Sequence, residues 1–124
     1  MSNKKIALVD DEEVFHWITK QFIGRVDSEI QVMSFYNGRE AIEHLSAKKD
    51  LPDMILLDIN MPIANGWVFL DQYVENLESL GIPIFVVSSS IDPEDQRKAN
   101  SYECVKDFIS KPLDVATLNK ILKD

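Results

Sequence analysis

The sequence predicts an α/β fold, a doubly wound five-stranded parallel sheet with helices on both faces. Five short apolar runs alternate with segments of helical periodicity, and this alternation is typical of a parallel sheet with right-handed crossovers. Three runs are almost wholly apolar, as expected for strands covered on both faces, whereas the second and fifth include polar residues and are predicted nearer the sheet edges. The runs are residues 6–9, 30–35, 54–57, 82–87 and 105–109.

The segments between the runs carry helix signals. After the first run, apolar residues recur at every fourth position, at Val14, Ile18 and Phe22. A segment over residues 67–77 follows Gly66 and is rich in apolar residues at helical spacing. The other helical segments open on residues that commonly cap helix N-termini, one of them with proline at the next position; these residues are Asn37, Asp92 and Asp114.

Composition and charge exclude several classes of function. The chain has 124 residues, of which 45% are hydrophobic and 27% charged, as in one globular domain. Its formal net charge of −8 argues against binding to nucleic acid or to an anionic membrane, and no apolar stretch is long enough to span a bilayer. Cys104 is the only cysteine, which suits the cytoplasm, and we expect it to be a small buried apolar contact. The only histidines, His16 and His44, are too few for a zinc cluster, and we expect both to be solvated helix residues.

Polar residues gather where the predicted strands end. Asp10 and Asp11 follow the first run, Asp58 the third, Ser88 the fourth, and Lys111 the fifth. Because parallel strands present their carboxyl ends at one edge of the sheet, these side chains are predicted to meet there, where such folds bind ligands. Taken singly, Asp11 is equally explained as a helix cap, Ser88 as a strand-end hydroxyl and Lys111 as a surface lysine. Their joint placement favours a functional site.

These residue types suit phosphoryl chemistry. Clustered carboxylates repel one another, so without a cation at least one should have a raised pKa. An all-oxygen site of this kind suits Mg²⁺, which often contacts substrate phosphate as well. Lys111 offers a positive charge and Ser88 a hydroxyl donor to phosphate oxygens, and a carboxylate can itself accept a phosphoryl group. The sequence therefore predicts a magnesium-assisted aspartyl-phosphate site.

The ordered motifs resemble those of the response-regulator receiver domain of two-component signalling, in particular stand-alone, chemotaxis-regulator-like receivers. The resemblance implies a flavodoxin-like (βα)5 fold with strand order 2-1-3-4-5, and one receiver domain over residues 1–124 without an output domain. The matching motifs span almost the whole chain, and as an ordered set they are far more specific than any one of them: VDDE at 9–12, NGREA at 37–41, LDINMP at 57–62 with Gly66 following, VSS at 87–89 and FISKP at 108–112.

The resemblance also implies how the site is built. Asp58 would be the phosphoacceptor. Asp11 would be a direct ligand of Mg²⁺, Asp10 would act mainly through water, and Asp58 and the backbone carbonyl of Asn60 would complete the protein ligands.

Further roles concern binding of the phosphoryl group and the switch. The resemblance implies that Lys111 binds the phosphoryl group through an ammonium directed by a cis bond to Pro112. It also implies that Ser88 belongs to the catalytic group with Asp58 and Lys111, and that Ser88 and Phe108 form the switch. Phenylalanine replaces the tyrosine that is common at this position, and Cys104 replaces a small residue, often glycine.

The implied partners are a sensor histidine kinase or a histidine phosphotransfer protein, and a downstream target protein. We expect no nucleic-acid or membrane partner, a monomer or weak dimer, and a cytoplasmic location. The protein would catalyse its own phosphorylation and dephosphorylation as a signalling protein, without being an enzyme for an external substrate. We also expect Phe15 or Trp17 on the first helix to be partly exposed beside the acidic site, where a donor would dock.

Three other functions compete with this interpretation. A phosphatase of the haloacid-dehalogenase type would need an acid/base two positions after Asp58, where Asn60 stands instead. A flavodoxin-like cofactor binder would need a neutral phosphate loop, whereas residues 10–13 are all acidic. A pseudo-receiver that binds partners without phosphorylation remains as the third alternative.

Overall fold

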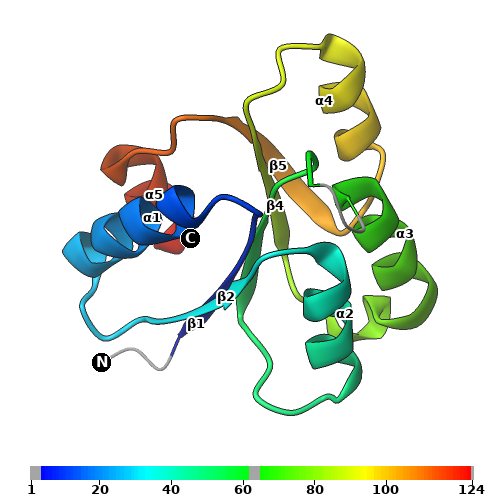
Figure 1. Cartoon of the computed structure of the whole chain (residues 1–124), viewed down its shortest axis with the longest axis horizontal. Helices are drawn as coiled ribbons and strands as arrows, with labels where there is room; N and C mark the ends of the chain where they lie inside the picture. The colour runs from blue at the N-terminus through cyan, green and yellow to red at the C-terminus, as the bar shows by residue number, and fades with distance from the viewer. Residues whose placement is uncertain (1–3, 62–64, 124) are drawn as a thin grey trace.

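The computed structural model describes residues 4–61 and 65–123, and these ranges form one parallel sheet with helices on both faces (Figure 1). The strand order is β2-β1-β3-β4-β5, so the predicted fold class and the strand order implied by the resemblance are confirmed. Pro62, at the end of the third motif, lies outside the described residues. The strands are β1 (Lys5–Val9), β2 (Gln31–Phe35), β3 (Met54–Leu57), β4 (Ile84–Ser88) and β5 (Val105–Ser110).

The helices divide between the two faces of the sheet. The helices α1 and α5 lie on one face, and α2, α3 and α4 on the other (Figure 1). None of the helices in the described part of the chain is long and apolar enough to cross a membrane. The helical elements are α1 (Glu13–Val26), α2 (Gly38–Ser46), α3 (Gly66–Asn76), the short 3₁₀ helix η1 (Glu78–Leu80), α4 (Pro93–Asn100) and α5 (Val115–Leu122).

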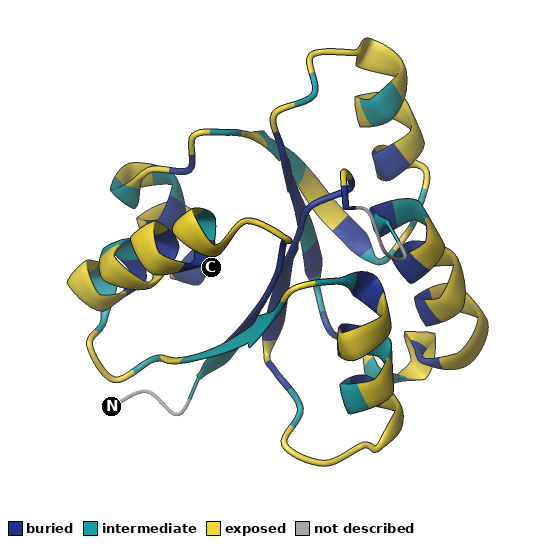
Figure 2. Cartoon of the chain, in the orientation of Figure 1, coloured by how far each residue is buried: buried dark blue, intermediate teal, exposed yellow. Residues whose placement is uncertain are grey.

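The core consists of two apolar layers separated by the sheet. Successive strand residues point to opposite faces, so Ile6 and Leu8 pack under α1 and α5, whereas Ala7 and Val9 pack under α2 and α3. The central strands are buried on both sides, and β2 and β5 are partly exposed at the edges, as predicted (Figure 2).

The predicted helix caps are confirmed. Asn37 Oδ1 accepts a hydrogen bond from the backbone N–H of Glu40 at 2.9 Å. The cap residues Asp92 and Asp114 each accept a backbone N–H in the first turn of α4 and α5. The cap of α3 was not predicted: Asn65 Oδ1 accepts from the backbone N–H of Val68 at 3.0 Å.

The buried side of α1 is not the one marked by the fourfold apolar spacing. The fourfold spacing marks the helix correctly, but Val14 is 68% exposed and Ile18 is 39% exposed. The face toward the sheet carries His16, Thr19 and Ile23, each about 1% exposed. The expectation that His16 is a solvated helix residue is therefore wrong, because its two ring nitrogens find polar partners inside the fold.

Candidate functional site

Three carboxylates meet at the edge of the sheet where β1 and β3 end. One carboxylate oxygen from each of Asp10, Asp11 and Asp58 lies within 4.8 Å of the other two. Asp10 and Asp58 are buried, and Asp11 is exposed. The backbone N–H of Asp58 donates to the carbonyl of Val9 at 2.9 Å, which holds the two strand ends side by side. The predicted convergence of these residues is confirmed.

The donor set suits a hard divalent cation. All three side chains offer carboxylate oxygens, and one side of the group is open to solvent, where an ion could keep bound water. Asn60 lies in the turn beside this group, because its backbone N–H donates to Asp58 Oδ1 at 3.1 Å. The residues present therefore fit Mg²⁺, and the role of the Asn60 carbonyl as a ligand stays a prediction.

The environment of Asp58 changes its acidity. Burial is the largest cause that raises its pKa from 3.8 to about 6, and the charges of Asp10 and Asp11 raise it further. The hydrogen bond from the Asn60 N–H and the charge of Lys111 act in the opposite direction. A raised pKa in the cluster was predicted from repulsion between carboxylates, whereas the larger cause is loss of solvent around Asp58.

Lys111 bridges the acidic residues from the end of β5. Its Nζ donates to Asp10 Oδ2 at 2.8 Å and to Glu12 Oε1 at 3.1 Å, and lies 3.8 Å from Asp58 Oδ2. The ammonium also lies 4.5 Å from the centre of the Phe15 ring. Burial alone would lower the pKa of Lys111, but the bond to Asp10 and the charge of Asp58 raise it above its ordinary value. The lysine is therefore cationic, and its main partner is Asp10.

The backbone around Lys111 fixes this arrangement. The peptide bond between Lys111 and Pro112 is cis, as the resemblance implies. The backbone N–H of Lys111 donates to the carbonyl of Ser88 at 2.9 Å, so the ends of β4 and β5 stay paired up to the site.

Ser88 and Phe108 occupy different environments. Ser88 is fully buried, and its Oγ accepts the backbone N–H of Ser90 at 3.0 Å. The Ser90 hydroxyl in turn donates to Asp95 Oδ2 in α4 at 2.5 Å, which links the end of β4 to that helix. Phe108 is half-buried and packs against the core layer under α2, α3 and α4.

An apolar groove of about 350 Å³ opens beside Lys111, between α1 and the segment that leads into α5. Trp17 on α1 is 63% exposed and Phe15 is half-buried, so the predicted exposure of one of these residues beside the site is confirmed. The groove is lined by Glu12, Val14, Phe15, Ile18, Thr19, Lys111, Pro112 and Leu113.

Gly66 lets α3 approach the loop that carries Asp58. A Cβ atom at this position would lie 2.5 Å from Ile59 Cα and 2.8 Å from the Asp58 carbonyl oxygen, closer than real Cβ contacts. Only glycine avoids this clash, so Gly66 helps to define the position of the loop that carries Asp58. The need for glycine at position 66 does not follow from its place before a helix, because the clash is with a segment that only the fold brings close.

His16 and Ser34 are site residues that sequence reasoning missed. His16 Nε2 lies 2.7 Å from the Asp10 carbonyl oxygen, and its Nδ1 lies 3.0 Å from Ser34 Oγ. The spacing of His16, Thr19 and Ile23 along α1 is a helical pattern in its own right, and it could have indicated the buried face had polar residues been included.

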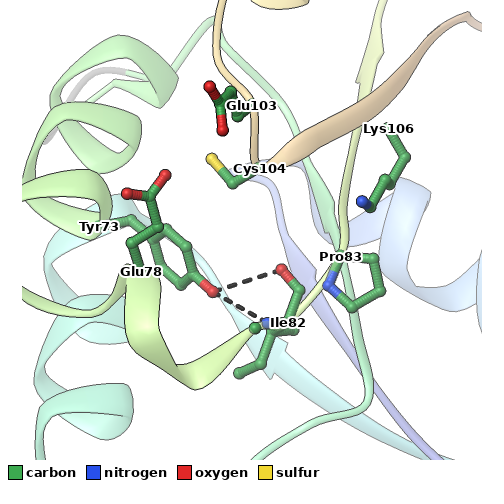
Figure 3. A pocket seen from close by; sticks show the side chains of 8 residues that line it. Tyr73, Glu78, Ile82, Pro83, Glu103, Cys104 and Lys106 are labelled. Atoms are coloured by element: carbon green, nitrogen blue, oxygen red, sulfur yellow. Dashed lines mark hydrogen bonds between the residues drawn. The ribbon is translucent and has the colours of Figure 1, made fainter.

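A second cavity, of about 220 Å³, lies at the amino ends of β4 and β5, at the opposite end of the sheet from the carboxylates (Figure 3). In its wall the Tyr73 hydroxyl donates to the Ile82 carbonyl and accepts the Ile82 N–H. Cys104 borders the cavity and is half-buried, not fully buried as expected. Burial raises the pKa of its thiol, which is consistent with an unreactive apolar contact.

Comparisons with known proteins agree with this geometry. The family model of the response regulator receiver domain matches residues 6–123. Protein PilH of Pseudomonas aeruginosa is 30% identical over 92 residues, which cover 74% of each chain. Several other curated relatives are longer, and the chain spans between 20% and 52% of their length.

Solved structures show the same similarity. The two component response regulator from Cytophaga hutchinsonii superposes with a TM-score of 0.87 at 29% identity, over 97% of this chain and 94% of that one. The phosphorylated cyanobacterial phytochrome response regulator RcpA superposes with a TM-score of 0.82 at 28% identity, over 98% and 90% of the two chains. With its strand order, its group of carboxylates and a family match over nearly every residue, this chain belongs to the response regulator receiver family.

Proposed function

We propose that this protein is a phosphoacceptor of a two-component or phosphorelay pathway, and that Asp58 receives a phosphoryl group from a phosphohistidine. The observation that carries the proposal is the position of the Asp58 carboxylate, which lies between two further carboxylates and the Lys111 ammonium at the ligand-binding edge of the sheet. The phosphorylated state of the related regulator RcpA supports it.

The hydrogen bonds of Asp58 indicate which oxygen reacts. Oδ1 accepts the N–H of Asn60, whereas Oδ2 lies 3.8 Å from Lys111 Nζ and accepts no hydrogen bond from the residues that the structure describes. In the proposed step, Asp58 Oδ2 forms a bond to phosphorus while the phosphorus–nitrogen bond of the donor histidine breaks. The electron pair of that bond returns to the imidazole nitrogen. The step requires the ionised carboxylate, and a pKa of about 6 allows this form at neutral pH.

Charge neutralisation makes the step possible at a site with three carboxylates. We propose that Asp11, Asp10, Asp58 and the backbone carbonyl of Asn60 hold Mg²⁺, which supplies positive charge to the phosphoryl oxygens when bound. Lys111 supplies a second positive charge. Its ammonium releases Asp10 and Glu12 and turns to a phosphoryl oxygen once Asp58 is modified.

We propose that Ser88 couples phosphorylation of Asp58 to the surface near α4. When its hydroxyl donates to the phosphoryl group, the bond that it now accepts from the Ser90 N–H is disturbed. Because Ser90 also donates to Asp95 of α4, we propose that this helix and the half-buried Phe108 shift and present a changed surface to a target protein.

The phosphoryl donor is proposed to be a sensor histidine kinase or a histidine phosphotransfer protein in the cytoplasm. It would dock on α1, where Trp17 and Val14 are more than half exposed and the groove is bordered by Lys111, whose ammonium contacts Asp10. In this role the protein is a signalling component that catalyses only its own phosphorylation and dephosphorylation.

Intact mass spectrometry tests the proposal. Acetyl phosphate and Mg²⁺ should add one phosphoryl group to the wild type and to Asp107→Asn, which changes an exposed carboxylate outside the site. Asp58→Asn should remain unmodified. An unmodified wild type would contradict the proposal and favour a pseudo-receiver.

Amide chemical shifts test the transmission of the signal. Beryllofluoride, which mimics a phosphoryl group on a carboxylate, should shift the signals of residues 88–108 as well as those of the carboxylate loops. Changes confined to the loops that carry Asp10, Asp11 and Asp58 would show that the modification is not transmitted to α4.

A further inference from the structure

The Asp10 backbone is held from two sides at the start of the acidic loop. Its N–H donates to the Phe35 carbonyl of β2 at 3.1 Å, and its carbonyl oxygen lies 2.7 Å from His16 Nε2 on α1. The ring of His16 is 1% exposed and lies 4.3 Å from the centre of the Tyr36 ring. The loop that carries Asp10 and Asp11 is therefore fixed by contacts from β2 and from α1.

The hydrogen bonds define the tautomer of His16. A backbone carbonyl can only accept, so Nε2 carries the proton and donates to Asp10. Nδ1 lies 3.0 Å from the Ser34 hydroxyl, which can donate to this nitrogen when it carries no proton. Ser34 thus orients the ring, and the ring orients the peptide between Asp10 and Asp11.

The remaining polar atoms of Asp10 are also bonded. Oδ1 accepts the N–H of Glu12 at 2.8 Å, and Oδ2 accepts from Lys111 at 2.8 Å. The Asp10 carbonyl oxygen faces the interior, and His16 is its hydrogen-bond donor. Without that bond the carbonyl would be a buried acceptor without a donor, and the peptide would gain by rotating toward water, which would move both carboxylates.

We propose that His16, oriented by Ser34, is a positioning residue that presets Asp10 and Asp11 for the divalent cation. This inference rests on the proposed function, because it assigns His16 a part in the same site. Groups that orient metal-binding residues without touching the metal commonly contribute 10–100-fold to metal affinity. A buried histidine kept only for packing would affect the stability of the protein and leave its affinity for Mg²⁺ unchanged.

Titration of the metal-free protein with Mg²⁺, followed by the amide shifts of Asp11 and Asn60, tests the inference. His16→Leu keeps the volume but loses both polar atoms, and should weaken Mg²⁺ binding about tenfold. His16→Gln places an amide N–H near the position of Nε2 and should restore affinity to within about threefold of the wild type.

A matched control separates positioning from stability. Ile23→Ala removes a buried side chain from the same face of α1 without touching the acidic loop, and should lower the melting temperature while leaving Mg²⁺ affinity unchanged. Equal weakening in Ile23→Ala and His16→Leu, or none in His16→Leu, would overturn the inference.

The tautomer gives a readout that does not depend on the metal. Long-range proton–nitrogen spectra of the imidazole should show the proton on Nε2 in the wild type, and a proton fixed on Nδ1 would overturn the inference. A wild type that binds no Mg²⁺ would overturn the proposed function as well, whereas normal binding in both wild type and His16→Leu overturns only the positioning role.

Discussion

Lys111 Nζ lies 2.8 Å from Asp10 Oδ2 but 3.8 Å from Asp58 Oδ2, so the lysine is bonded to the buried Asp10 carboxylate and only close to Asp58, the proposed phosphoacceptor. This pairing neutralises Asp10 inside the fold. It also leaves Asp58 Oδ2 without a direct hydrogen bond from the lysine, which suits the nucleophilic role proposed for this oxygen.

Replacement of Lys111 should therefore have two separate effects. Lys111→Met leaves the buried Asp10 carboxylate without its cation and should destabilise the metal-free protein by roughly 3 kcal/mol. It should also slow phosphorylation by acetyl phosphate at least tenfold, since a cation for the phosphoryl oxygens is lost. Chemical denaturation and intact mass measure the two effects, and Lys120→Met, an exposed control, should show neither.

The stability of the metal-free protein should depend on the protonation of Asp58. Its pKa is about 6 in the fold and 3.8 without the fold, so the folded state binds this proton more strongly. The stability that the protonated Asp58 contributes to the folded state is fully present below about pH 4 and is lost as the pH rises through 6. Asp58→Asn should therefore gain stability relative to the wild type over that range, by on the order of 1–2 kcal/mol because solvent at the open edge screens part of the shift. Denaturation at pH 4, 5, 6 and 7 measures the difference, and a constant difference would contradict the assigned pKa.

Mg²⁺ should stabilise the folded protein. Binding to the folded state alone raises stability by about 2.7 kcal/mol at a concentration one hundred times the dissociation constant. We expect millimolar Mg²⁺ to raise the melting temperature of the wild type, and Asp11→Ala to lose this gain. The exposed carboxylate of Asp53 lies outside the cluster, so Asp53→Ala should keep the gain and serves as the control. A wild-type melting temperature that does not change with Mg²⁺ would count against the proposed metal site.

Gly66 should not tolerate even alanine. The added Cβ would meet backbone atoms of Ile59 and Asp58, so α3 or the loop that carries Asp58 must move. We expect Gly66→Ala to cost about 1–3 kcal/mol, and the melting temperature to fall by roughly 4–12 °C. Gly24→Ala is a matched control, because a Cβ there meets nothing within 4 Å and alanine favours the helix. Loss of stability in both variants would show that the close approach is not the cause.

A cluster of aromatic and polar contacts should limit the motion of α4. Only Ala99 of this helix is buried, but Tyr102 just after it stacks on Trp67 and donates to Asp71 Oδ1 at 2.7 Å. Tyr102→Phe should cost about 1 kcal/mol and speed amide exchange in α4, without changing Mg²⁺ affinity. Asp71→Asn retains an acceptor and should have a smaller effect. Unchanged exchange in Tyr102→Phe would show that the bond does not hold the helix.

The meeting of the functional residues at the strand ends could be predicted from the sequence, because it follows from the geometry of parallel sheets. Parallel strands place their carboxyl ends at one edge, so residues far apart in the chain, such as Asp10, Asp58 and Lys111, meet whatever the loops between them do. The capping residues could also be predicted from the sequence, because Asn37 and Asp114 each accept a hydrogen bond within the first turn of their own helix.

Other features depend on contacts that no local pattern contains. The polarity of His16 suggested that its side chain is exposed to solvent. Instead, the Asp10 carbonyl and Ser34 provide hydrogen-bonding partners that only the packing of α1 on β2 brings near. The main cause of the raised pKa of Asp58 is burial, which follows from the assembled site and not from the number of acidic residues in the motif.

The sheet separates two surfaces that have different proposed tasks. The helices α1 and α5 lie on one face and α4 on the other, and each face is filled by its own apolar layer. A donor bound to α1 and a target bound to α4 would thus occupy opposite sides of the molecule without competing. If both proposed surfaces are used, they could diverge independently, and a new pairing of input and output would need only surface substitutions, with the carboxylates unchanged.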